Sequence, residues 1–129
     1  MKLFLAAVMT LLSVSGYAAF SEVECEGYSG VKNIYVEIEE PFPSTSVFRR
    51  VFVEVSTSQT RENFYHTVSL NRYGGFSIVN YQGAGFRMQL DLWPDNQPRW
   101  GRTYSATLVS SNINGGLASS LFCRFPNAN

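Results

Sequence analysis

Residues 91–101, DLWPDNQPRWG, bring two tryptophans, two aspartates and an arginine into one short segment that prolines interrupt. Carboxylates and guanidinium groups at this spacing can form ion pairs, and indole rings supply large contact surfaces for a partner. Five side chains in and beside this segment are therefore candidates for recognition: Trp93, Asp95, Arg99, Trp100 and Arg102.

The same segment also has the features of a tight connection between two strands. Pro94 suits the second position of a type I turn, and Asp95 suits the next position. The two indoles would then return side by side and pack as a pair, while Asp91 or Asp95 binds a neighbouring arginine. We interpret the segment first as a structural connection and second as a recognition loop.

The single histidine, His66, is the first residue to consider for general acid–base chemistry. It shares its alternation with Phe64, Val68 and Leu70, so we expect it to point toward the core. A Ser-His-Asp triad would need an identifiable nucleophile, and the G-x-S-x-G pattern of a nucleophile elbow does not occur. Hydrolysis of a glycosidic bond needs a pair of carboxylates, and no such pair can be distinguished from the other surface acids in this sequence. The sequence therefore predicts that the protein is not an enzyme.

Five aromatic side chains fall on the strand parity opposite to the expected core: Tyr35, Phe52, Tyr65, Trp93 and Phe122. If they gather on one side of the molecule, they form an exposed patch for a protein, a peptide or a glycan. The alternative is cross-strand pairing, which stabilises a sheet by ~0.2–1 kcal/mol per pair. Both interpretations stay open from the sequence alone.

The N-terminus has the pattern of a secretory signal peptide. A positive start precedes a short apolar run at 3–12, and Gly16 and Ala18 are small residues at the positions that a signal peptidase reads. We expect cleavage after Ala18, which makes 1–18 the signal peptide and 19–129 a single β domain. The alternative is an uncleaved anchor, but a helix needs ~20 apolar residues to span a bilayer. We expect an exported protein, periplasmic or secreted, with no membrane span after cleavage.

The expected mature chain carries nine basic and ten acidic side chains, so its net charge is close to −1. A nucleic-acid-binding domain usually has a strong basic excess, so we expect no nucleic-acid partner. An envelope or extracellular protein or a glycan is the partner class that fits better. Acidic residues concentrate in 19–60 and basic residues in 61–129, which predicts that acidic and basic strands face each other.

The mature chain contains two cysteines, Cys25 and Cys123, one near each end. An even number of cysteines in an exported protein suggests a disulfide; two free thiols or a metal site are the alternatives. A bridge between them would close a loop of almost the whole domain. With one histidine and two bridged cysteines, only carboxylates would remain as metal ligands, and they show no EF-hand spacing. We therefore predict no metal and no cofactor.

Short runs rich in valine, isoleucine, phenylalanine and tyrosine alternate with clusters of glycine, proline, asparagine and serine. In the first run Val23 and Cys25 face the core, and Glu22, Glu24 and Glu26 face outward. The third run shows the same alternation, interrupted by a charged residue, Arg49. The eight predicted strands are 21–27, 31–39 (stopped by Pro41), 47–56, 63–70, 76–82, 86–93, 102–110 and 117–125.

Eight short strands at this spacing predict an all-β fold, a single antiparallel barrel or sandwich. Cys25 and Cys123 both fall on the apolar parity of the first and last strands. Terminal strands tied by a disulfide would lie side by side and close a barrel. An immunoglobulin-like sandwich is the alternative, but its bridge usually lies in the middle of the chain.

Several short motifs resemble those of small uncharacterised exported β proteins of Gram-negative bacteria: V-E-C-E-G, Y-x-G-x-G-F, D-L-W-P-D, W-G-R-T-Y and F-C-R-F. That resemblance implies no activity. In size, export and its terminal cysteines the chain is also similar to the periplasmic inhibitors of c-type lysozyme, which are small eight-stranded barrels. The S-G-x-x-Y motif that those inhibitors insert into the enzyme has no match here, because Ser29 and Gly30 stand at the wrong distance from Tyr35.

These observations predict a non-catalytic exported binding module of the cell envelope, which presents loops from a disulfide-tied β barrel. A structural or assembly protein of the envelope is one alternative, and an inhibitor of a secreted hydrolase is another.

Overall fold

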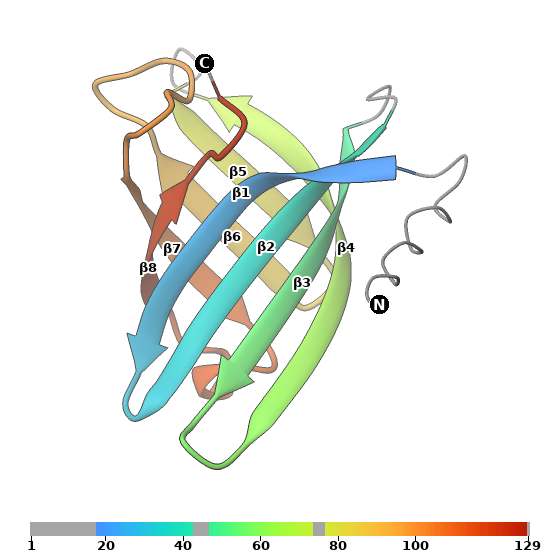
Figure 1. Ribbon diagram of the computed structural model, residues 1–129, viewed down its shortest axis with the longest axis vertical. Helices are drawn as coiled ribbons and strands as arrows, with labels where there is room; N and C mark the ends of the chain where they lie inside the picture. The colour runs from blue at the N-terminus through green and yellow to red at the C-terminus, as the bar shows by residue number, and fades with distance from the viewer. Residues whose placement is uncertain (1–17, 43–46, 74–76, 129) are drawn as a thin grey trace, which may run out of the picture.

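The computed structural model describes residues 18–42, 47–73 and 77–128, whose strands form one closed barrel (Figure 1). Apart from Ala18, the expected signal peptide lies outside the described residues. No helix within the described ranges is long and apolar enough to cross a membrane. The elements are β1 (Ala18–Ser29), β2 (Lys32–Phe42), β3 (Phe48–Ser56), β4 (Arg61–Tyr73), β5 (Ile78–Gly83), β6 (Phe86–Asp91), β7 (Tyr104–Ser110), the 3-10 turn η1 (Asn114–Gly116) and β8 (Ser119–Arg124).

Each strand runs antiparallel to the next, and β8 returns to pair with β1. In Figure 1 the blue β1 and the red β8 lie side by side and close the sheet. The structure therefore confirms the predicted antiparallel eight-stranded fold and selects the barrel over the sandwich. Closure also removes the open edge strands that a flat sheet exposes to other chains.

The alternation of apolar and polar residues places one set of side chains inside the barrel. Along β6 and β8 buried and exposed residues alternate strictly, as expected for strands with one face toward the core. Fully burying one leucine or isoleucine side chain stabilises a fold by ~1.5–3 kcal/mol. The largest fully buried side chains are Tyr81, Ile34, Ile38, Met88, Leu90, Leu92, Leu108 and Leu121.

β2 extends past the residue that was expected to end it. The sequence predicts a strand at 31–39 that Pro41 and Pro43 stop, whereas in the structure Pro41 belongs to β2 and pairs with Ala19 of β1. Pro43 lies outside the described residues. The ladder between β2 and β3 has already ended, with Glu39 opposite Arg50. Pro41 therefore has a strand on one side only, which is the position where a missing N–H group is tolerated.

The predicted disulfide closes the barrel. Cys25 of β1 and Cys123 of β8 stand directly opposite each other and are bonded, across a sequence separation of 98. Nearby, Gly27 lies opposite Leu121. A Cβ atom at position 27 would overlap with Leu121 Cδ2 and with the carbonyl oxygen of Ser120. The two terminal strands can therefore approach this closely because position 27 has no side chain.

Removal of the bridge should lower stability substantially. We expect Cys25→Ala/Cys123→Ala to lose about 4–5 kcal/mol of unfolding free energy, because the chain-entropy model gives this value for a loop of this length. Urea unfolding followed by circular dichroism, with and without reductant on the unmodified protein, measures the difference. If both midpoints coincide, strand pairing and the core hold the barrel closed without the disulfide.

Candidate functional site

The predicted recognition residues lie in the connection between β6 and β7, which extends beyond the strand ends near the C-terminus (Figure 1). Its entry is a turn in which the Asp95 amide donates a hydrogen bond to the Leu92 carbonyl oxygen (2.7 Å). The Trp93–Pro94 peptide bond is cis, so Pro94 occupies the third position of a type VI turn. The predicted type I turn, with this proline second, is wrong. Asp91 Oδ1 also accepts a hydrogen bond from the Trp93 amide (3.0 Å).

Asp95 is the centre of the loop. Its side chain is only 10% exposed and lies within ion-pair distance of Arg99 Nε (3.4 Å) and Arg102 Nη1 (3.6 Å). Its Oδ2 accepts a hydrogen bond from the buried Tyr104 hydroxyl (2.8 Å), which itself accepts one from the Arg99 amide (3.0 Å). Burial, followed by the hydrogen bond to Asp95, raises the pKa of Tyr104. The structure thus confirms that one loop aspartate binds the arginines, and it adds Tyr104 as the anchor.

The two indoles do not form the expected pair. Trp93 is 74% exposed and Trp100 is 71% exposed, and the ring contacts within the described ranges include neither of them. The loop is held instead by Asp95 and by Leu92, whose side chain is fully buried in the core. The polar contacts therefore fix the backbone and leave both indoles facing solvent.

A charged network lies at one end of the barrel, and the alternation of the sequence does not predict it. Glu22 was expected to face outward, but the register shifts between Ser21 and Val23 and makes Glu22 the extra residue of a β-bulge. Its side chain bonds Arg49 Nε (2.6 Å) and accepts a hydrogen bond from the Tyr81 hydroxyl. Burial, then the charge of Glu22, raises the pKa of Tyr81 well above its ordinary value. The interruption of the apolar pattern at Arg49 was the one sequence signal of this network.

The loop and the charged network border the same pocket, which has a volume of about 300 Å³. Pro98 of the loop forms part of its wall, and Arg49, whose side chain is 8% exposed, forms part of its floor. Arg49 also lies 3.7 Å from Glu40. The remaining lining residues are Glu22, Leu70, Arg72, Phe125, Asn127 and Ala128.

The five aromatic residues that were expected to face outward do not form one patch, and Tyr35 and Phe52 are half-buried. Tyr35, Phe52 and Tyr65 make a continuous row across β2, β3 and β4, with ring centroids 6.5 Å and 5.4 Å apart. Phe122 is separated from this row by β1, where it lies opposite Glu26. Trp93 follows β6, four strands away from β2 around the barrel. The structure therefore supports the cross-strand interpretation for three rings and leaves the loop indoles as a separate feature.

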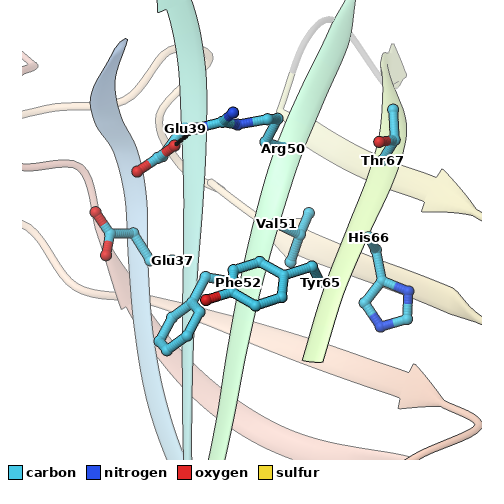
Figure 2. Close-up of a pocket in the computed structure, with 8 residues that line it drawn as sticks. All are labelled: Glu37, Glu39, Arg50, Val51, Phe52, Tyr65, His66 and Thr67. Carbon is cyan, nitrogen blue, oxygen red and sulfur yellow. Dashed lines mark hydrogen bonds and ion pairs between the residues drawn. The ribbon is translucent and has the colours of Figure 1, made fainter. Parts of the chain in front are cut away.

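The row borders a groove of about 520 Å³ on the outer wall of the barrel. Figure 2 shows the rings of Phe52 and Tyr65 close together and Glu39 turned toward Arg50. The side chains of Val51 and His66 are directed away from these two rings. His66 packs against Phe86 in a tilted arrangement with ring centroids 5.1 Å apart, and its buried Nε2 atom has no hydrogen-bond partner among the residues that the structure describes.

Within the described residues no three histidine, cysteine, aspartate or glutamate side chains gather in the way that a metal ion requires.

No protein-family model matches the chain, and searches of curated proteins and of solved structures find no match.

The buried ion pair generates a stability prediction. We expect Arg49→Leu to lose ~3–5 kcal/mol, because it leaves the Glu22 carboxylate without its cation in a largely buried position. Glu22→Gln/Arg49→Leu should lose less, because the amide keeps an acceptor for the Tyr81 hydroxyl and carries no charge. Chemical unfolding of both variants measures the two losses. Equal losses would mean that lost packing, and not an unpaired charge, controls this end of the barrel.

The Tyr104 hydroxyl generates a prediction about the loop. Tyr104→Phe removes both hydrogen bonds of that hydroxyl, and we expect a loss of ~1–3 kcal/mol. Trypsin should cleave the variant faster after Arg99 or Arg102, because the loop backbone opens more readily. Tyr65→Phe, at an exposed ring outside the loop, is the matched control. Unchanged cleavage in Tyr104→Phe would show that the ion pairs of Asp95 suffice to hold the loop.

Proposed function

We propose that this protein is an exported, non-catalytic binding module of the cell envelope that recognises its partner with the loop at 92–102. The observation that supports this most is the contrast within the loop. Trp93 and Trp100 are largely exposed, yet the backbone that carries them is fixed by Asp95 and Tyr104.

An indole on a fixed backbone is well suited to recognition. Tryptophan, tyrosine and arginine dominate the binding energy of protein interfaces because they bury large surfaces and also donate hydrogen bonds. A loop that is already ordered loses little conformational entropy when a partner binds. Arg99 and Arg102 are about half exposed beside Asp95, so each can keep its ion pair and present further N–H donors. An envelope or extracellular protein or a glycan is the partner class that these groups fit.

Inhibition of a secreted hydrolase is the second candidate, and one observation favours it. The stiff loop extends from the end of a closed barrel (Figure 1), and a protruding rigid loop can enter the cleft of an enzyme. The resemblance in architecture to the periplasmic inhibitors of c-type lysozyme points the same way. Inhibition assays with secreted lysozymes and proteases separate this candidate from a module that binds without inhibiting.

Both tryptophans of the chain lie in this loop, so the intrinsic tryptophan fluorescence of the native protein reports on the loop alone. We expect strong quenching by acrylamide in the free protein. Partner binding should shift the emission to shorter wavelength and protect it from the quencher, because both indoles leave water. Envelope extracts, a glycan array and secreted hydrolases are the samples to titrate.

Trp93→Ala and Trp100→Ala should change the unfolding free energy by less than ~0.5 kcal/mol, because exposed side chains contribute little to folding. Each should abolish most of the binding that the unmodified protein shows. Phe122→Ala is the matched control, since it removes another exposed aromatic ring outside the loop. A partner that is retained by both tryptophan variants and lost with Phe122→Ala would place recognition on β8 and refute the proposal.

A further inference from the structure

The part of the outer wall formed by β1, β2 and β3 carries more carboxylates than the ion pairs of the described residues neutralise. Its outward-facing carboxylates on β1, β2 and β3 are Glu24, Glu26, Glu37, Glu39 and Glu54. Three of them have an arginine partner, in the pairs Glu24–Arg124, Glu39–Arg50 and Glu54–Arg61. Within the described ranges neither Glu26 nor Glu37 takes part in an ion pair, and the wall therefore keeps an excess of negative charge.

Glu37 stands in the least favourable position of this set. It lies directly opposite Glu24 in the ladder between β1 and β2, and like charges in this arrangement destabilise a sheet. Arg124 neutralises Glu24 through two contacts to Glu24 Oε1, at 3.0 Å and 2.7 Å. Glu37 accepts one long hydrogen bond, from the Tyr35 hydroxyl (3.4 Å). Among the described residues, Glu37 therefore has this hydrogen bond and no ion-pair partner of its own.

Two aromatic residues follow Glu37 across the next two strands. Phe52 lies directly opposite Glu37 across β2 and β3, and Tyr65 lies opposite Phe52. Glu37, Phe52 and Tyr65 line the groove of about 520 Å³ together with the Glu39–Arg50 ion pair and Thr67 (Figure 2). Burial and then the charge of Glu37 raise the pKa of Tyr35 to about 12, which is consistent with a negative potential along this row.

A carboxylate beside aromatic faces is the arrangement that recognises an organic cation. The carboxylate accepts N⁺–H hydrogen bonds, and the negative face of each ring attracts the same positive charge. We propose that this groove binds a lysine or arginine side chain of a basic segment on a partner polypeptide, with Glu37 as its acceptor and with Phe52 and Tyr65 as its aromatic wall. Charge complementarity selects this occupant, because a neutral ligand would leave Glu37 uncompensated.

This surface is distinct from the loop of the proposed function. The groove lies on β2, β3 and β4, whereas the loop joins β6 to β7, on the other side of an eight-stranded barrel. The proposal for the groove can therefore be tested independently of the proposal for the loop.

An oligolysine peptide is the probe, and the same peptide with acetylated side chains is the control without charge. Titration of the full-length protein, followed by NMR, should shift amides of β2, β3 and β4 with oligolysine only. Glu37→Gln keeps the shape of the side chain and removes its charge, and we expect about fivefold weaker binding. Glu62→Gln removes an exposed carboxylate that does not line the groove, and it should leave the affinity unchanged. Phe52→Leu should weaken binding about threefold through the lost cation–π contact.

The melting temperature provides a second, independent readout. Glu37→Gln should leave it almost unchanged, because Arg124 already pairs with Glu24 and Glu37 has no ion pair among the described residues to lose. Weaker binding by this variant could then not be attributed to poorer folding. Equal affinity for acetylated peptide, equal weakening by Glu62→Gln and Glu37→Gln, or competition by a neutral oligosaccharide would each overturn the proposal. Unchanged affinity in Trp93→Ala would confirm that the loop takes no part.

Discussion

Closure of the barrel between β1 and β8 is the constraint on which the rest of the structure depends. The two strands come from opposite ends of the domain, yet Cys25 and Cys123 meet as direct partners. Gly27 allows the close approach beside the bridge, where any side chain would meet Leu121 and the Ser120 backbone. Once the sheet has closed, every strand has two neighbours and the interior is filled by one set of alternating side chains. Such a scaffold is stiff, so variation and recognition are left to connections and to the outer wall.

The barrel interior is not apolar throughout, and a charged network lies at the end that carries the loop. A bulge in β1 turns Glu22 inward, where it meets Arg49 and the Tyr81 hydroxyl. A buried ion pair is weak evidence for added stability, because desolvation of both charges offsets their attraction. Its clearer consequence is that it fixes three strands relative to one another. The contacts of Glu22 with Arg49 and Tyr81 join β1, β3 and β5 at this end of the barrel. Pro98 of the loop and Arg49 of the network then share one pocket.

The short spacing of the runs predicted an antiparallel fold. Alternation with a period of two residues was enough to predict the eight strands and the inward cysteines, because most core-facing positions obey it, although Val79, Asn80 and Tyr81 of β5 are all buried. It failed at Glu22, where one bulged residue reverses the parity, and a bulge leaves no mark in a single sequence. Turn chemistry identified the segment around Pro94 but not its cis peptide, since proline is compatible with several turn types. An ion pair between an aspartate and an arginine of this segment was predictable from spacing, although spacing did not choose between Asp91 and Asp95. The exposure of Trp93 and Trp100 was not, because it depends on whether tertiary contacts cover the rings.

The two aromatic surfaces follow different physical logic. In the loop, Asp95 accepts a hydrogen bond from Tyr104 and lies within ion-pair distance of both arginines, so the polar groups hold the backbone and the indoles remain as the contact surface. On the outer face of β2, β3 and β4, the rings already pack against one another. The group that remains there is the carboxylate of Glu37, which has no ion-pair partner among the described residues. The loop exposes apolar indole rings, whereas the groove exposes a carboxylate. We therefore expect the two surfaces to bind partners of different chemistry. Because these surfaces lie on opposite sides of a closed barrel, no side chain is shared between them, and binding energies at sites without shared contacts are expected to add.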